Sequence, residues 1–407
     1  MASLIDKLCE SLTIAFQMSD KSSGLERGKK VIRDARRRSA MQTALSYFQF
    51  VCLYSVSNKK GDVSLARFVL QCINDVFVTP FKGTITLTFG DVAESHVGMQ
   101  HIGTMASQGF RYAELSQARR FFEERGCEVH IIHLNKFLPS SDAFDIPERL
   151  EHLRVAKEDG DYQAWVLVVR NALNALTSDP NGKNLLAEML MFDWDTKLYN
   201  TKRGVVQNKL ARHNLNFSDQ KQVANFEIGH GTTIPWIEVP LLRILKQKLT
   251  LPFGNAAQDL QCEGNLYYER GKTGLSFHGD TERRKVIGVR LGNPLNISWV
   301  WYYNDEPGGK SVQISLNPGD MYCMSEKAVG TDWRPNLALG IRKKRYVLRH
   351  AAGAPSYMKT AAKPIKSDKL HIRNQRVWEE NPMVTIGDVW YKADKKKSWD
   401  EAGVRQP

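Results

Sequence analysis

Two residues in this chain have the types and spacing that a metal site needs, namely His278 and Asp280. Side chains two positions apart on a β-strand point to the same face, so both can contact one ion. Imidazole together with a carboxylate is part of the ligand set of non-haem Fe(II) proteins, which adds a second histidine. The same pair also occurs by chance at the surface ends of strands. The spacing therefore indicates a candidate metal site that the surrounding sequence must support.

The surrounding sequence supplies that support. Asn265 and Tyr267 form an Asn-x-Tyr motif upstream, Glu282 follows the pair, and a β-branched segment then ends at Gly292. This order resembles the AlkB-like branch of the Fe(II)/2-oxoglutarate-dependent dioxygenases, over roughly residues 202–353. The resemblance implies a double-stranded β-helix, with His278 and Asp280 as iron ligands. It also implies that Asn265 and Tyr267 hydrogen-bond to the co-substrate 2-oxoglutarate.

The family also has a distal histidine as third ligand, and two alignments are open for it. In the first, His350 is that ligand. In the second, Arg349 clamps the carboxylate of the co-substrate, and Asp332 or Trp333 stands in place of the histidine, which would damage or abolish iron binding. The first is favoured, because His350 is the only histidine in the stretch 281–370.

The resemblance further implies an arginine clamp some distance after the distal histidine. A planar guanidinium suits this role, because it pairs with a carboxylate through two parallel hydrogen bonds. Arg373 is predicted as the clamp and Arg349 is the reserve. With iron, 2-oxoglutarate and O2, the implied reaction is hydroxylation of a carbon–hydrogen bond, which removes an N-methyl group as formaldehyde.

A basic segment at 200–217 lies where the family has its nucleotide-recognition lid. It has four basic residues and no acidic residue, and it also has a histidine that can stack on a base. An enzyme of this kind acts on single strands or on a flipped-out base, which needs a basic track and aromatic contacts. The predicted nucleic-acid contacts are Lys202, Arg203, Lys209, Arg212 and His213.

The elements that must position these residues suggest an α+β fold in four parts. Apolar spacings of three and four predict a helical, basic extension at 1–81. Alternating strand and helix signals predict a small α/β domain at 82–178, with a parallel or mixed sheet. Short strands separated by turns predict a β-sandwich or barrel at 179–353, which the resemblance makes the double-stranded β-helix (jelly-roll) domain. A basic tail follows at 354–407.

Composition narrows the class of protein. The 407 residues contain 42% hydrophobic residues, which excludes global disorder, and no apolar run is long enough to span a bilayer. Six cysteines without any C-x-x-C pair suggest reduced thiols in an intracellular protein, either cytoplasmic or nuclear. The net charge of +13 lies almost wholly on the two terminal segments and the lid, which favours a polyanionic partner.

The main hypothesis is therefore an oxygenase that oxidatively demethylates a modified base in nucleic acid, without a membrane partner. A second hypothesis is a catalytically inactive β-helix protein that binds nucleic acid or has a structural role. A third is a protein hydroxylase, which the basic lid disfavours.

Overall fold

The computed structural model describes residues 81–138, 163–303, 306–332 and 346–353, with short strands at 384–387, 398–399 and 405–406. The predicted helical extension at 1–81 lies outside the described residues except for Phe81. Most of the predicted tail at 354–407, including Arg373, lies outside them as well.

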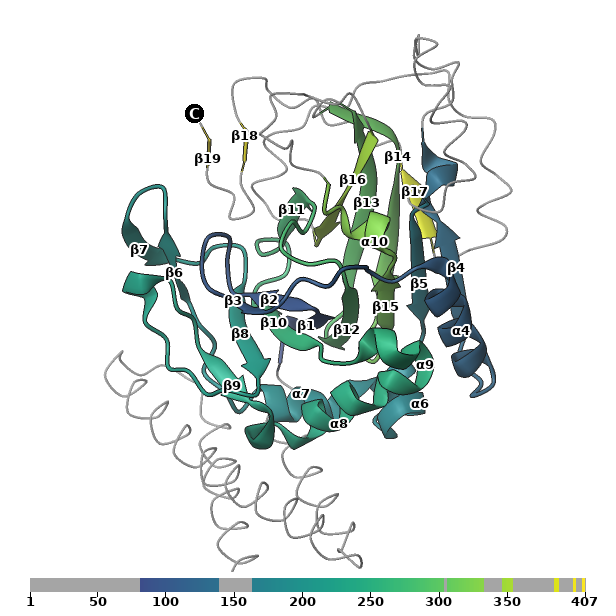
Figure 1. The fold of residues 1–407 in the computed structure, drawn as a ribbon, viewed down its shortest axis with the longest axis horizontal. Coiled ribbons are helices and arrows are strands. Elements are labelled where there is room, and N and C mark those ends of the chain that lie inside the picture. The colour runs from purple at the N-terminus through teal and green to yellow at the C-terminus, as the bar shows by residue number, and fades with distance from the viewer. Residues whose placement is uncertain are drawn as a thin grey trace, which may run out of the picture.

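The largest element is an eight-stranded sheet with the order β4-β5-β15-β12-β1-β10-β8-β9 (Figure 1). All neighbours in it are antiparallel except β8 and β9, which are parallel. Its strands are β1 (Thr84–Gly90), β4 (Val129–His133), β5 (Trp165–Val169), β8 (His213–Ser218), β9 (Thr233–Pro235), β10 (Gln261–Tyr267), β12 (Val286–Gly292) and β15 (Met321–Met324).

A five-stranded sheet faces part of the larger one. Its order is β11-β16-β13-β14-β17, and its neighbouring strands are antiparallel. Val286 and Met324 of the large sheet share a buried cluster with Trp299 and Ile314 of the small one, so the two sheets pack face to face. The strands are β11 (Leu275–His278), β13 (Leu295–Tyr303), β14 (Glu306–Leu316), β16 (Tyr346–Ala352) and β17 (Val384–Gly387).

Three two-stranded sheets complete the β-structure. They are β2 (Val92–Glu94) with β3 (His101–Gly103), β6 (Lys197–Asn200) with β7 (Val205–Asn208), and β18 (Ser398–Trp399) with β19 (Arg405–Gln406).

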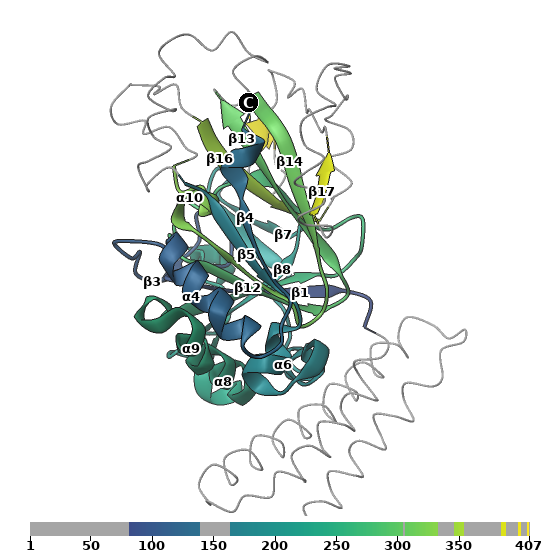
Figure 2. The same ribbon diagram turned by 90° about the vertical axis from the view of Figure 1, so that its right-hand side faces the viewer.

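Helices cover the outer face of the eight-stranded sheet. Ile287, Val289 and Leu291 alternate along β12 and pack with apolar helix residues such as Leu245 and Phe253. In Figures 1 and 2, α6, α8 and α9 lie together beneath the strands of this sheet. The helices are α4 (Tyr112–Glu123), α6 (Ala172–Thr177), α7 (Lys183–Met189), α8 (Pro240–Lys248), α9 (Thr250–Phe253) and α10 (Glu326–Val329).

The inner face of the same sheet is polar along its central strands. Thr86 of β1 lies opposite Asn265 of β10 on one side and Arg290 of β12 on the other, and all three are buried. Because side chains alternate between the faces of a strand, the apolar outer residues force these polar residues inward. The space between the sheets therefore has the polar lining of a binding site.

The fold is mixed α+β and mostly sheet within the described residues, which agrees with the expected class at that level. The sheet, however, runs across the predicted boundary at residue 178, because β1 lies between β10 and β12, and β5 pairs with β15. Of the strands in the predicted small domain, β1, β4 and β5 therefore belong to the eight-stranded sheet, where β4 pairs with β5 antiparallel. Only β2 and β3 form a separate two-stranded sheet. Local sequence patterns reveal strands but not their distant partners.

Two expectations about the environment can also be compared with the structure. Cys127, Cys262 and Cys323, the cysteines among the described residues, form no disulfide with one another. Within the described ranges, the apolar helices are all too short to cross a bilayer.

The position of β1 predicts a single folding unit. Leu87 is fully buried in the core on the helix side, so Leu87→Ala should lower the free energy of unfolding by about 2 to 5 kcal/mol. Denaturant unfolding can be followed by circular dichroism and by tryptophan fluorescence. The substitution should lower the midpoint denaturant concentration of both curves by the same amount. Lys82→Ala, at an exposed position just before β1, should change stability by less than about 0.5 kcal/mol. Two separate transitions with only one displaced would show that β1 belongs to an independent domain.

Candidate metal centre

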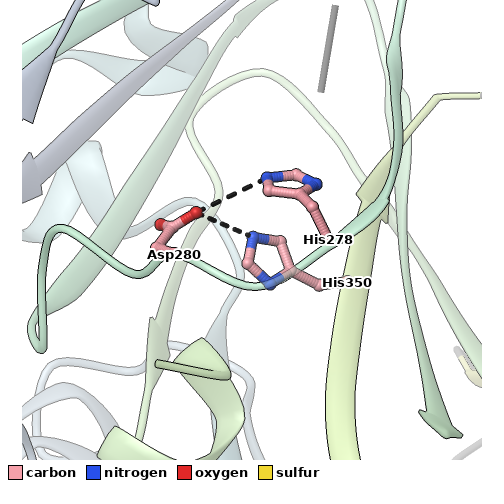
Figure 3. Close-up of side chains that lie close together, drawn as sticks. All are labelled: His278, Asp280 and His350. Atoms are coloured by element: carbon pink, nitrogen blue, oxygen red, sulfur yellow. Dashed lines mark ion pairs between the residues drawn. The ribbon is translucent and has the colours of Figure 1, made fainter. Parts of the chain in front are cut away.

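Two strands of the small sheet bring a histidine–aspartate–histidine triad together. β11 pairs with β16 so that His278 lies directly opposite His350, and Asp280 follows two residues after the end of β11. One donor atom from each side chain lies within 4.8 Å of the other two. Figure 3 shows the carboxylate of Asp280 directed at both imidazole rings.

The separations suit one shared ion. Oδ1 of Asp280 lies 3.5 Å from Nε2 of His278 and 3.7 Å from Nε2 of His350. Two atoms that each bind a metal at about 2.1 Å can be no more than about 4.2 Å apart. All three residues are buried, with at most 8% of the residue surface exposed. The triad is therefore a compact and nearly dry donor set.

The protein orients the first histidine for metal binding. Nδ1 of His278 lies 2.7 Å from the backbone oxygen of Ser276, which accepts a hydrogen bond from a protonated Nδ1. That bond selects the tautomer whose Nε2 has a free lone pair, and Nε2 is the atom that faces Asp280.

The second histidine is held in its neutral form. Burial and the neighbouring His278 lower the pKa of His350 from 6.5 to about 3, against the opposing effect of Asp280. Its Nδ1 is buried and has no hydrogen-bond partner. Only neutral imidazole binds a metal, so His350 can act as a ligand without first losing a proton at physiological pH.

An arginine holds the far side of the aspartate. Nε of Arg283 lies 3.5 Å from Oδ2 of Asp280, while Nη2 lies 2.7 Å from Glu263 and 2.9 Å from Glu282. Burial would raise the pKa of Asp280, but the charge of Arg283 and the contact with His278 lower it overall. Oδ1 is thus left for an ion as part of a permanently ionised carboxylate.

The structure favours the first of the two alignments for the third ligand. His350 belongs to the triad, whereas Asp332 is paired with Lys327 at 2.6 Å. Arg349 is on the opposite face of β16 from His350, with its guanidinium 4.2 Å from the ring centre of Tyr302. The reserve prediction that Arg349 clamps a co-substrate is therefore wrong, since adjacent residues of a strand point to opposite faces.

Asn265 and Tyr267 do lie on the inner face of the large sheet, as a role beside the triad requires. Asn265 Oδ1 accepts hydrogen bonds from Arg212 and, at 2.7 Å, from Nδ2 of Asn214. Tyr267 is buried in a cluster with Ala352 of β16. Both residues are thus in the layer between the sheets that contains the triad.

The five predicted nucleic-acid contacts divide into two groups. Lys202 and Arg203 are exposed at the turn of the β6–β7 hairpin, which projects at the left of Figure 1. His213 is partly buried, and its ring is stacked on Tyr268 with centroids 4.2 Å apart. These three residues are accessible, or partly accessible, to a ligand.

Lys209 and Arg212 are buried, so the prediction that they contact nucleic acid at the surface is wrong. Nζ of Lys209 donates to Oδ1 of Asn214 at 3.0 Å, and burial lowers its pKa from 10.5 to about 7. Arg212 lies 3.5 Å from Glu263. Because this segment has no acidic residue, its cations were expected to be exposed to solvent. In the fold, however, groups on neighbouring strands pair with Lys209 and Arg212.

Sequence reasoning missed the residues around the triad that balance its charge. Arg283 and Glu263 are both buried and contact each other. One signal was present, because Glu263 and Asn265 are polar residues alternating within an otherwise strand-like segment. Such alternation predicts a polar face but not its partner.

A cavity of about 630 Å³ adjoins the chain segment that follows the triad aspartate. It is lined by Thr281 and Glu282, which directly follow Asp280, and by residues of β2 and β3. Glu94 and His101 are 3.0 Å apart on its wall. Burial and the nearby Asp280 raise the pKa of Glu282 to about 7. None of the three triad residues lines this cavity.

Comparison with known proteins identifies one relative. An uncharacterized protein of Acanthamoeba polyphaga mimivirus is 37% identical over 282 residues, which cover 69% of this chain and all of the relative. No family model matches the chain, and no solved structure matches it.

The triad predicts metal binding that depends on each of its members. His350→Ala and Asp280→Asn should each weaken Co(II) affinity by more than about 100-fold, because losing even an outer partner of a ligand costs roughly 10- to 100-fold. Calorimetric titration of the metal-free protein measures this effect. His101→Ala, which removes a histidine–carboxylate contact outside the triad, should leave the affinity unchanged. Equal loss in all three variants would place the ion elsewhere.

Proposed function

This chain belongs to the same family as the uncharacterized mimivirus protein, and we propose that it is an Fe(II)- and 2-oxoglutarate-dependent oxygenase. The buried triad of His278, Asp280 and His350 carries the proposal. Two imidazoles and one carboxylate on one side of an ion are the donor set of non-haem Fe(II) oxygenases, and they leave other positions open for substrates.

The donor set fits this metal in charge as well as in geometry. A neutral His350, a His278 oriented by Ser276 and an ionised Asp280 need no proton rearrangement before they bind a cation. Bound iron, together with 2-oxoglutarate and O2, supplies the hydroxylation of an unreactive carbon–hydrogen bond. The resemblance of Asn265 and Tyr267 to the family motif supports 2-oxoglutarate as the co-substrate.

The chain itself orients the reactants and excludes water. Arg283 holds Asp280 through its outer oxygen and neutralises part of the acidic cluster around it. The two packed sheets bury the triad, which strengthens every charge interaction at the site. These features preorganise the donor set before any substrate arrives.

We assign the two facing sheets to a double-stranded β-helix. Three observations support this assignment. The sheets pack face to face, and the two histidines of the triad lie on β11 and β16 of the smaller sheet. Residues of these strands, such as Ala352, also pack against the larger sheet. In this arrangement β1, from the segment before residue 179, takes a central place in the larger sheet.

The proposed substrate is a modified base in nucleic acid, taken as a single strand or flipped out of a duplex. The exposed Lys202 and Arg203 on the β6–β7 hairpin support it, as does the stacked pair of His213 and Tyr268. Cations hold phosphates and aromatic rings stack on bases. The cavity beside Glu282 has room for the reacting group. On an N-methyl group, hydroxylation ends in demethylation.

Turnover of the co-substrate tests the proposed activity. The purified full chain with Fe(II), ascorbate and 2-oxoglutarate should form succinate even without a nucleic-acid substrate, although slowly. His350→Ala should form none, because the triad loses a ligand. If the iron-loaded protein neither binds 2-oxoglutarate nor forms succinate, the enzyme proposal fails and an inactive binding or structural protein takes its place.

Salt-dependent binding tests the proposed substrate class. The double variant Lys202→Ala/Arg203→Ala should bind a single-stranded oligonucleotide more weakly. The slope of log affinity against log salt concentration should be smaller in magnitude by about 1.4, because each lost phosphate contact on a single strand contributes about 0.7 to that slope. Lys209→Met is the control, since that lysine is buried, and it should keep the original slope. A wild-type affinity that is indifferent to salt would contradict the nucleic-acid proposal.

A further inference from the structure

Arg290, on the inner face of β12, has no carboxylate partner among the described residues. Only 1% of its surface is exposed. Nη1 donates a hydrogen bond to Oγ1 of Thr86, and Nε is buried without any partner. The other buried arginines each lie close to a carboxylate: Arg170 at 2.6 Å from Asp320, Arg212 at 3.5 Å from Glu263 and Arg283 at 2.7 Å from Glu263.

A buried guanidinium without a counter-ion is costly. Removing a charge from water costs several kcal/mol unless an opposite charge and hydrogen bonds compensate for it. Burial accordingly lowers the pKa of Arg290 despite the opposing effects of two tyrosines and of Asp320, which forms its ion pair with Arg170 instead. An arginine nevertheless remains protonated in proteins. The arrangement is therefore incomplete by itself, and an anion between the sheets would complete it.

The position of Arg290 relates it to the triad. Arg290 on β12 lies opposite Thr86 on β1, and Thr86 lies opposite Asn265 of the Asn-x-Tyr motif on β10. Tyr267 and Tyr322 are both buried, and each interacts electrostatically with Arg290 on one side and with Asp280 on the other. Arg290 therefore shares the polar inner layer of the large sheet with Asn265, and the two buried phenol groups interact with charges at both places.

We propose that Arg290, with Thr86 of β1, forms a buried subsite for the distal carboxylate of a small dicarboxylic acid whose other end reaches the triad. The proposal rests on the function proposed above, for which the dicarboxylate is 2-oxoglutarate. It gives Arg290 the role predicted for Arg373, which lies outside the described residues, or for Arg349 in reserve, which faces away. It also places the anchor on a strand before the distal histidine. It also gives β1 a direct role in binding.

A ligand pair tests the subsite on the unaltered protein. With Co(II) bound, 2-oxoglutarate should raise the melting temperature and bind with a dissociation constant that calorimetry can measure. 2-Oxobutyrate has the same 2-oxo acid end without the distal carboxylate, and it should bind on the order of 100-fold more weakly, because one partner of a buried charge pair is missing. Equal affinity for the two acids would overturn the proposal, as would equal protection by inorganic phosphate.

Substitution then assigns the effect to Arg290. Arg290→Met should weaken 2-oxoglutarate binding on the order of 100-fold while Co(II) affinity changes less than about twofold. Without ligand, this variant should be at least as stable as the wild type, because it removes an uncompensated charge. Arg349→Gln is the control and should bind 2-oxoglutarate normally. Unchanged binding by Arg290→Met, or a large loss of ligand-free stability, would make Arg290 a structural residue and overturn the subsite.

The subsite and the metal centre can fail separately. Glutarate and 2-oxoglutarate added to metal-free protein should still protect the wild type and not Arg290→Met. If this difference persists while the triad binds no metal, the oxygenase proposal falls and the anion subsite remains. If metal binds but neither acid protects the protein, the anion subsite falls.

Discussion

The different character of the two faces of the eight-stranded sheet is the constraint on which this structure depends. Along β1, β10 and β12, alternate residues are apolar and pack against helices, so the residues between them must face the smaller sheet. Polar groups forced into that layer need partners, because an unsatisfied buried polar group costs free energy. Most of them find partners on neighbouring strands. The result is a layer whose polarity is imposed by the apolar packing behind it.

Within this layer, charge balance decides what each group can do. Arg283 is surrounded by Glu263, Asp280 and Glu282, so carboxylates compensate its charge. Arg290 forms no ion pair with a carboxylate among the described residues, which is why we propose an anion as its partner. Two buried arginines therefore differ in their partners. Burial alone does not distinguish them.

The metal centre and the basic hairpin lie on different parts of the architecture. The triad depends on β11 pairing with β16 in the smaller sheet. The exposed cations are on the β6–β7 hairpin, which belongs to neither main sheet. If the proposed roles hold, substitutions in the hairpin can change the bound ligand without altering the strand pairing that forms the donor set. Relatives such as the mimivirus protein can be compared on this basis.

The sequence by itself identified the residues of the candidate metal centre but little of their surroundings. His278 and Asp280 were identified by their spacing of two residues, and His350 by being the only histidine in a long stretch. Both features can be recognised in the sequence without knowledge of the fold. A short β-branched segment between turns also predicted β16, the strand that carries His350. Tertiary structure alone decided that Arg349 faces outward, that Lys209 and Arg212 are buried, and that β1 lies between β10 and β12. The reason is that a strand pattern states which residues share a face but not which neighbour that face meets. Pairing between strands almost two hundred residues apart decides that neighbour, and with it whether a cation is solvated, neutralised or left for a ligand.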